Sequence, residues 1–235
     1  MEILKGLFAK DKALWLPAQK VLVIADLHIG YEEALNKQGI FMPRRQFSEM
    51  QKELKEQLME FKPRVVVING DLKHEFGEIS KQEWWETSKI LDLILSCCKK
   101  VILVKGNHDT ILKPIARKKG LEVRDFYKVN DICFLHGDVL LKNKQAEKAK
   151  MLVIGHEHPA VSLREGRKIE KYKCYLLGRW KRQKLLVMPS FFSIFEGVDV
   201  KKEKLLSPYL QQNLSKFELF IVGDKVYKFG KLENI

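Results

Sequence analysis

Five short, largely apolar runs, each followed at once by polar side chains, constrain the fold of this chain more than any other feature. The runs cover residues 21–25, 64–68, 101–104, 131–135 and 151–154, and each has the length of a strand buried on both faces. Connections of helix length alternate with the strands, so right-handed crossovers and a largely parallel sheet are expected. The pattern therefore predicts an α/β fold.

Two of the connections have the periodicity of amphipathic helices. In the first, apolar residues recur at three- and four-residue intervals, at Phe47, Met50, Leu54, Leu58 and Phe61. A second helix is predicted from about residue 82 to residue 98. Ser48 with Gln51, and Ser80 with Glu83, have capping-box spacing at the two helix starts.

Beyond Pro159 the pattern changes. Segments near residues 161–163, 172–177, 185–188, 217–222 and 226–229 are strand-like and are separated by turn residues. This favours a second, mainly antiparallel sheet. With 235 residues, of which 46% are apolar, the chain is expected to form one domain (1–235), with a motif-bearing half at about 20–160 and a second-sheet half at about 160–235.

The residues that end the five runs can all ligate metals or transfer protons. They are Asp26 and His28, then Asp71, then Asn107 and His108, then His136, and finally His156 and His158. Because sites in open α/β sheets form outside the carboxyl ends of the strands, these dispersed motifs can converge. Five of the six histidines fall in them, and the sixth, His74, follows Asp71 by three residues. Unrelated surface histidines would not be expected to gather at the ends of the strands in this way.

The mixture of ligand types indicates the kind of metal. Imidazoles combined with carboxylates and one amide, without thiolates, favour Mn²⁺, Fe or Zn²⁺ and disfavour Ca²⁺. There are too many ligands for one ion, so two ions about 3.5–4 Å apart with a bridging carboxylate are expected, the arrangement that hydrolyses phosphate esters. The four cysteines form no C-x-x-C pair and are interpreted as reduced, packed thiols.

The ordered set D-x-H, G-D, G-N-H-D, H and G-H-x-H resembles the calcineurin-like metallophosphoesterase superfamily. Residues 70–76 (GDLKHEF) and 155–159 (GHEHP) are similar to its ICC-like branch, which includes archaeal proteins related to the bacterial DNA-ligase-associated phosphoesterases. The motifs extend from Asp26 to Pro159. The resemblance implies a four-layer αββα sandwich, in which two facing mixed sheets are flanked by helices and a dinuclear metal site lies at the strand ends.

The resemblance also implies a role for each motif residue. The first metal would be held by Asp26, His28 and His158, the second by Asn107, His136 and His156, and Asp71 would bridge them. Two divalent ions are implied, with Mn²⁺ preferred over Fe, Zn²⁺ or Ni²⁺. A hydroxide held between the ions would attack the phosphate in line. His108 would stabilise the transition state or protonate the leaving oxygen, and Asp109 would orient His108.

The substrate is less closely defined by the sequence. A formal charge of +13 favours a polyanionic partner such as nucleic acid, and equally fits a Lys- and Glu-rich surface of the kind found in thermophile proteins, with Lys in excess. With the motifs, it favours a phosphodiester in nucleic acid or a nucleotide. Arg44 and Arg45 are candidates for the rim of the site or for an ordinary solvated helix start, and His74 is either a substrate contact or a residue packed in its loop. Residues 178–184 interleave Trp180 with cations, as single-strand binding surfaces do, although an exposed hairpin turn is the favoured interpretation.

Two other functions stay open. A phosphomonoesterase acting on a small metabolite would use the same metal centre, and a non-catalytic interaction scaffold would keep the same fold. Protein serine/threonine phosphatases carry an Asp-Arg pair where this chain has Lys73 and His74, so that activity is not expected. Association with DNA repair proteins is implied by the family resemblance alone.

The sequence contains no signal peptide and no apolar stretch of about 18 residues, the minimum for a transmembrane helix. A cytoplasmic protein that does not contact a membrane is therefore expected.

Overall fold

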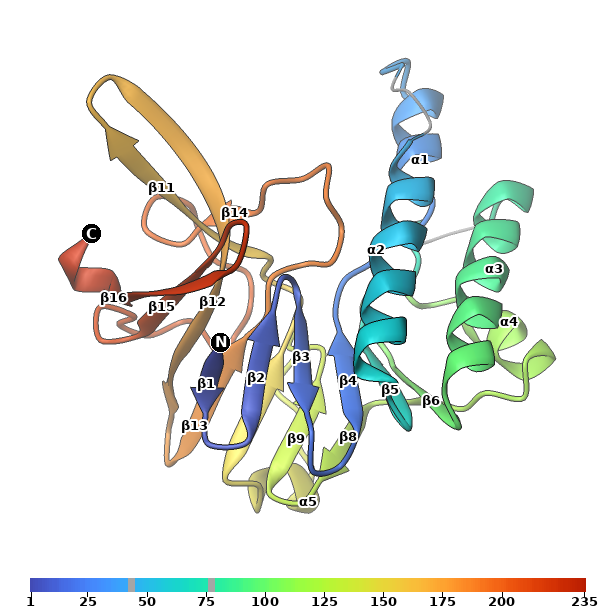
Figure 1. The fold of residues 1–235 in the computed structure, drawn as a ribbon, viewed down its shortest axis with the longest axis horizontal. Coiled ribbons are helices and arrows are strands. Elements are labelled where there is room, and N and C mark those ends of the chain that lie inside the picture. The colour runs from blue at the N-terminus through green and yellow to red at the C-terminus, as the bar shows by residue number, and fades with distance from the viewer. Residues whose placement is uncertain (42–44, 76–78) are drawn as a thin grey trace.

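The computed structural model describes residues 1–41, 45–75 and 79–235, and it contains two β-sheets packed face to face (Figure 1). In the first sheet the strand order is β1 (Glu2–Leu4), β2 (Leu7–Lys10), β3 (Ala13–Leu16), β4 (Val21–Ile24), β5 (Val65–Asn69), β6 (Lys100–Val104) and β7 (Val123–Arg124). Strands β4 to β7 are parallel, whereas β1 to β4 form an antiparallel meander.

The second sheet is formed by the C-terminal half of the chain. Its strands are β8 (Phe126–Val129), β9 (Ile132–Leu135), β10 (Met151–Ile154), β11 (Pro159–Glu165), β12 (Lys168–Trp180), β13 (Gln183–Val187), β14 (Val198–Asp199), β15 (Glu218–Val222) and β16 (Val226–Lys231). The order across it is β14-β11-β12-β13-β10-β9-β8, and β15 joins β12 to β16. Strands β9, β10 and β13 are parallel, whereas β12 is antiparallel to β11, β13 and β15.

The change from one sheet to the other comes earlier in the chain than we expected. We expected all five apolar runs in one largely parallel sheet and a second sheet only after Pro159. Instead β9 and β10 pair with β13 in the second sheet, and the chain changes sheets at Asp125, between β7 and β8. A short apolar run buried on both faces fits an inner strand of either sheet equally well, so its composition does not identify its partners.

The helices cover the outer faces unequally. Helices α2 (Gln46–Phe61), α3 (Lys81–Cys97) and α4 (Lys113–Lys118) pack on the first sheet, and α1 (Tyr31–Lys37) lies at one end of α2. The outer face of the second sheet is covered by the short α5 (Lys144–Glu147), the 3₁₀ helix η1 (Leu232–Asn234) and the irregular segment 200–217. The predicted αββα class is confirmed, with a thinner fourth layer. No helix in the described ranges is long and apolar enough to cross a membrane.

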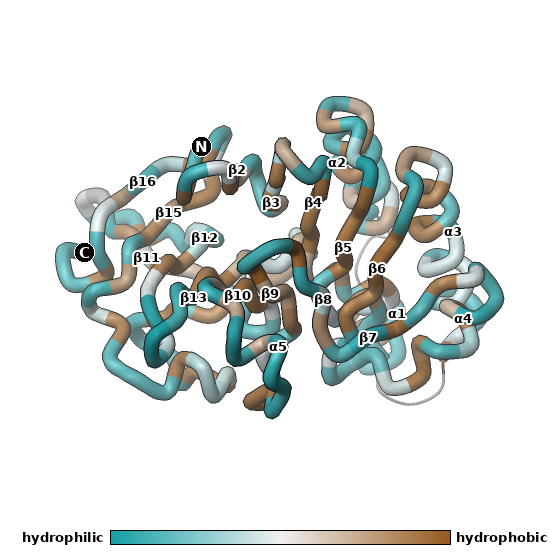
Figure 2. Tube along the Cα trace, turned by 90° about the horizontal axis from the view of Figure 1, so that it is seen from below, coloured by the Kyte–Doolittle hydropathy of each residue, from teal (hydrophilic) through white to brown (hydrophobic). Residues whose placement is uncertain are grey.

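Alternate strand residues belong to different hydrophobic cores. In β4, Val21 and Val23 lie in the core between the sheets, whereas Leu22 and Ile24 pack in the core under the helices. The same alternation recurs in the second sheet, whose outward residues join a third core. Both faces are therefore apolar, which explains the unbroken runs. Strands β4, β5 and β6 are brown over most of their length in Figure 2.

One of the two predicted helix starts is confirmed. Ser80 is the N-cap of α3, and its hydroxyl accepts a hydrogen bond from the Glu83 N–H at 3.0 Å. The other prediction was wrong: α2 begins at Gln46, and the Ser48 hydroxyl donates to the Arg45 carbonyl inside the first turn. Ser48 is thus too far into the helix to act as a cap.

Candidate metal centre

The carboxyl ends of β4, β5, β6, β9 and β10 meet at one edge of the sandwich, although they belong to two sheets. Backbone hydrogen bonds join the loops that leave these strands. The His28 N–H donates to the Asp71 carbonyl at 3.0 Å, and the Gly155 N–H donates to the His136 carbonyl at 2.9 Å. The motif residues therefore lie on loops that hold one another in place.

The first group of ligand-type side chains contains Asp26, His28 and His158. The Nε2 atoms of the two histidines are 3.2 Å apart, and His158 Nε2 lies 3.7 Å from Asp26 Oδ2. Asp26 and His28 are buried. These three residues are the ones assigned to the first metal from the sequence.

The second group contains Asp71, His136 and His156. His136 Nε2 lies 3.3 Å from Asp71 Oδ2, 3.2 Å from His156 Nδ1 and 2.9 Å from Asn107 Oδ1. The same Asp71 Oδ2 is 3.7 Å from His28 Nε2 in the first group. Asp71 therefore lies between the two groups, where a bridging carboxylate is needed.

The chemistry of this donor set fits two cations. Burial lowers the pKa of His28 to about 3 and that of His156 to about 4, so both imidazoles keep a lone pair at neutral pH. Burial opposes protonation of His136 as well, but the hydrogen bond and charge of Asp71, with the charge of Asp26, raise its pKa to about 9. The surroundings of His136, between Asp71 and Asp26, thus favour a positive charge. Buried Asp26 Oδ1 and His136 Nδ1 have no hydrogen-bond partner among the described residues.

Most of these ligand-type residues adopt an uncommon backbone conformation. Positive φ angles of 41° to 65° occur at five of the seven, namely Asp26, His28, Asp71, His156 and His158. This left-handed region is sparsely populated by residues other than glycine, and such residues cluster at functional sites. The sequence did not predict this feature.

Two glycines are required by close packing against the ligand-type side chains. A Cβ atom on Gly106 would lie 2.1 Å from Asp71 Oδ1, and one on Gly70 would lie 2.0 Å from His136 Nδ1. Both separations are far below van der Waals contact. At Gly106 the absence of a side chain leaves the space that the Asp71 carboxylate occupies.

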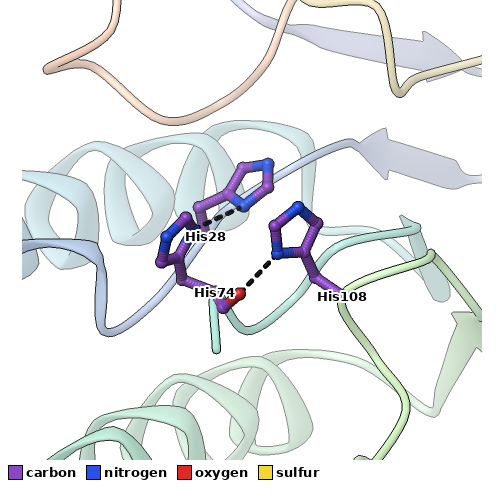
Figure 3. Close-up of side chains that lie close together, drawn as sticks. All are labelled: His28, His74 and His108. Carbon is purple, nitrogen blue, oxygen red and sulfur yellow. Dashed lines mark hydrogen bonds between the residues drawn. The ribbon is translucent and has the colours of Figure 1, made fainter. Parts of the chain in front are cut away.

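His108 is held by contacts to Asp71 and to the His74 loop. Its backbone N–H donates to Asp71 Oδ1 at 2.9 Å, and its Nδ1–H donates to the His74 carbonyl (Figure 3). The rings of His74 and His108 are stacked with centroids 5.1 Å apart. Because a carbonyl can only accept, Nδ1 carries the proton and Nε2 is the nitrogen that can exchange one.

His74 contacts the metal centre through its ring as well as its carbonyl. Its Nδ1 atom lies 3.3 Å from His28 Nδ1, the nitrogen of His28 that faces away from the first group (Figure 3). Burial lowers the pKa of His74 to about 4, so the ring is neutral. In this geometry His74 orients a ligand-type histidine, a common arrangement around metal-binding imidazoles.

Asp109 has a different environment from the one we expected. Its carboxylate accepts hydrogen bonds from the backbone N–H groups of Gly106 at 2.9 Å, Leu72 at 3.1 Å and Lys73 at 3.4 Å. It therefore joins the loop after β5 to the loop after β6. Orientation of His108 comes from the His74 carbonyl instead, because the side chain of Asp109 is fully engaged with the backbone.

Arg45, a candidate for the site rim, is not connected to the site by the structure. Arg45 is the N-cap residue of α2, and its backbone N–H donates to Glu32 at 3.1 Å. Among the described residues, no contact joins the Arg45 side chain to the ligand groups. Arg44 lies outside the described residues.

Two charged residues that support the site were not predicted. Buried Glu83 accepts hydrogen bonds from the backbone N–H groups of His74 and Glu75, both at 3.0 Å, and so holds the loop that orients His108. Its capping-box spacing indicated a place near Ser80 but not this contact. Lys173 donates to Ser190 Oγ at 2.5 Å, and burial, with the nearby charge of Lys12, lowers its pKa to about 7. No local sequence pattern indicates Lys173.

Comparison with known families matches residues 19–179 to the calcineurin-like phosphoesterases, and the chain belongs to this family. It is thus a metal-dependent phosphoesterase, in agreement with its clusters of His and Asp side chains. A search of curated proteins gave no match.

Among solved structures, the fold is similar to that of the Pseudomonas putida nuclease MPE. The TM-score is 0.67 and the identity 18%, over 92% of this chain and 90% of that one. The E. coli phosphoesterase Yfce also matches, with a TM-score of 0.39 and 16% identity over 85% of this chain and 86% of that one.

Proposed function

We propose that this protein is a dinuclear-metal-dependent phosphodiesterase that acts on nucleic acid or a nucleotide. The observation that carries the proposal is the position of Asp71, with Oδ2 3.3 Å from His136 Nε2 and 3.7 Å from His28 Nε2. A carboxylate shared by two imidazole-rich groups suits two ions that bind one phosphate.

In this proposal the residues of the site have two roles, metal binding and proton transfer. Asp26, His28 and His158 would hold one ion, Asn107, His136 and His156 the other, and Asp71 both. When bound, divalent ions supply Lewis acidity that binds phosphate oxygens and lowers the pKa of water. Mn²⁺ is the ion we expect, with Fe, Zn²⁺ and Ni²⁺ as alternatives.

His108, protonated on both ring nitrogens, donates its Nε2 proton to the leaving oxygen and is left as the neutral Nδ1–H form. The hydrogen bond from its Nδ1–H to the His74 carbonyl fixes the tautomer and the direction of the ring. Glu83 supports this acceptor by holding the His74 backbone, and Asp109 keeps the two loops together. His74 is accordingly a positioning residue in this proposal.

Three observations favour a diester over a monoester. The chain has Lys73 and His74 where protein phosphatases carry an arginine that grips a terminal phosphate. A cavity of about 180 Å³ opens beside Asn107 and His136 and has Lys105 at its rim, which leaves room for a second ester group. The P. putida protein with the similar fold is described as a nuclease.

The test compares a bis-aryl phosphate diester with the matching aryl monoester, after chelation and reloading with Mn²⁺, Fe²⁺, Zn²⁺ or Ni²⁺. The proposal expects higher kcat/KM for the diester and highest activity with Mn²⁺. Single-stranded DNA, RNA and cyclic nucleotides then identify the natural diester. A strong preference for the monoester would replace the proposal with a phosphomonoesterase, and no turnover with any metal would favour a scaffold.

A further inference from the structure

The basic hairpin turn between β12 and β13 lies away from the metal centre. Trp180 pairs with Gln183 across the turn, and the next residue, Lys184, pairs with Met151 at the start of β10. The metal centre follows the other end of β10, four residues away, which corresponds to about 13 Å along the strand. The turn is therefore remote from the ligand groups, and the proposed mechanism does not use it.

A cavity of about 440 Å³ opens beside this turn on the outer side of the second sheet. Trp180 and Tyr209 form one wall, with ring centroids 4.8 Å apart, and Leu140 and Leu141 contribute apolar surface. The Tyr209 hydroxyl accepts a hydrogen bond from the Leu141 N–H at 3.0 Å, which fixes that wall. Leu140 is 46% exposed, so the apolar surface is open to a ligand.

The rim of the cavity is strongly cationic. Lys142, Lys181 and Arg182 surround it, and Glu147 is the only acidic residue that lines it among the described residues. Lys181 Nζ lies 4.4 Å from the centre of the Trp180 ring. Within the described part of the chain, none of these three cations forms a salt bridge. An indole ring beside cations that form no salt bridge suits a ligand that has both a base and phosphates.

The cavity at the turn and the cavity at the metal centre are neighbours. Leu141 lines both, and the segment from His136 to Lys142 passes from the ligand groups to the rim of the remote cavity. Lys105 lies at one end of this path, and Lys142 and Lys181 lie towards the other. Asp125 and Asp138 line the metal-centre cavity together with Lys105, so the excess of positive charge lies at the remote cavity, where a polyanionic chain with one phosphate at the metal centre would meet Lys142, Lys181 and Arg182.

We propose that the cavity bounded by Trp180, Lys142 and Arg182 is a second contact site for a single-stranded nucleic acid whose scissile phosphate lies at the metal centre. This inference depends on the proposed phosphodiesterase function. An unpaired base stacks on Trp180, and neighbouring phosphates contact Lys142, Lys181 and Arg182. A paired base could not leave its duplex to reach the ring without loss of stacking, so single strands are preferred.

The experiment measures fluorescence anisotropy of a labelled single-stranded oligonucleotide of about 16 nucleotides, the upper range for single-strand sites, in the presence of a chelator. Trp180→Ala with Lys181→Glu is one variant, and Arg182→Glu, which alters only an exposed side chain, is the second. The matched control is Trp85→Ala with Lys89→Glu. Trp85 is 52% exposed and has Lys89 Nζ 4.4 Å from its ring centre, but it lies on α3, on the outer face of the other sheet.

We expect both cavity variants to weaken binding of the long strand, the Trp180 variant by roughly 10- to 100-fold from lost stacking. The slope of log Kd against log salt should fall by about 0.7 for each phosphate contact removed. The control should bind as the wild type does. With metal restored, the ratio of kcat/KM for the long strand to that for a dinucleotide should drop in the cavity variants and stay constant in the control.

Other outcomes would overturn the inference. Equal losses in the control and the cavity variants would mean nonspecific attraction to a basic surface. If a mononucleotide competed for the cavity as strongly as the long strand does, the cavity would be a site for free nucleotides. If duplex DNA bound with the same affinity as the single strand, a single-strand site would be excluded. If the wild type binds the strand through Trp180 but hydrolyses no diester, the proposed function fails while the contact site remains.

Discussion

At the scale of single residues, the metal centre depends on backbone conformation as much as on ligand identity. Asp26, His28 and Asp71 adopt positive φ angles, and their side chains lie in the two groups of ligand-type residues. Residues other than glycine enter this region at a cost in free energy, so the surrounding hydrogen bonds must hold them there. The His28 N–H to Asp71 carbonyl bond is one of these.

The proton-transfer role proposed for His108 can be separated from metal binding by one substitution. We expect His108→Ala to lower kcat on an aryl diester by about 10²–10⁴-fold, the usual contribution of a general acid, and to leave the bound metal content unchanged. Steady-state kinetics and metal analysis of the same preparation make the test. Wild-type turnover in the variant would remove His108 from the mechanism.

The close approach of Gly106 to Asp71 predicts a loss of metal from a substitution that adds one methyl group. In Gly106→Ala the new Cβ would lie 2.1 Å from Asp71 Oδ1 and displace that carboxylate. We expect metal affinity to fall by roughly 10- to 100-fold, as when a ligand is misaligned by its neighbours. Calorimetric titration with Mn²⁺ measures this. Gly223→Ala is the control, because its Cβ would meet nothing closer than 3.6 Å, and equal losses in both variants would contradict the argument.

At the scale of elements, the site depends on where strands and helices end. The start of α3 has two roles: Ser80 caps the helix, and Glu83 one turn later holds the His74 loop. Helix α2 has no equivalent cap, since Ser48 bonds only within the first turn. The spacing of Ser48 and Gln51 resembles that of Ser80 and Glu83, so spacing alone did not separate a true cap from a false one.

This difference predicts that two serine substitutions lower the free energy of unfolding by unequal amounts. Ser80→Ala should lower the free energy of unfolding by about 1 kcal/mol, because the Glu83 N–H loses its acceptor. Ser48→Ala should have little effect, because Ser48 is exposed and caps no N–H. Urea denaturation of both variants with the wild type compares them. A cost for Ser48→Ala as large as that for Ser80→Ala would argue that α2 begins later than described here.

At the scale of the whole molecule, both sheets contribute ligand-type side chains to the candidate metal centre, and the loop that follows β13 supports it. Phe191 and Phe192 donate backbone hydrogen bonds to the carbonyls of Ala25 and Asp26, at 2.7 and 3.3 Å. Lys173, on β12 of the second sheet, donates a hydrogen bond to Ser190 in the same loop. The loop after β13 thus holds the end of β4 in place. Substitutions in this loop can therefore alter the position of Asp26, although they lie far from it in the chain.

Burial of Lys173 predicts a pH dependence of stability. Its pKa is about 7 in the folded protein and 10.5 ordinarily, so between these values the unfolded chain binds more protons. The contribution of Lys173 to the free energy of unfolding is therefore fully present above about pH 10.5. It is lost as the pH falls to and through about 7. Metal-free wild type should gain stability from pH 7 to 10 relative to Lys173→Met. Urea unfolding across this range tests it, and a constant difference between the two proteins would contradict a depressed pKa.

Much of the site followed from local pattern. Each apolar run and the ligand residues after it are adjacent in the chain, so the periodicity of the strand and the chemistry of its end are both visible without a structure. Asp26, His28, Asp71, Asn107, His136, His156 and His158 were predicted in this way, and the structure brings them together. The fold class followed from the same runs and from the family resemblance.

The sequence alone predicted the five apolar strands, their buried character and the ligand-type residues at their ends. Only the tertiary structure decided which sheet β9 and β10 join, that Asp109 binds backbone amides while the His74 carbonyl orients His108, and that Glu83 and Lys173 support the site. The physical reason is that these features are contacts between residues distant in the chain. Strand pairing and buried hydrogen bonds depend on which groups meet after folding, and a local pattern cannot specify both partners.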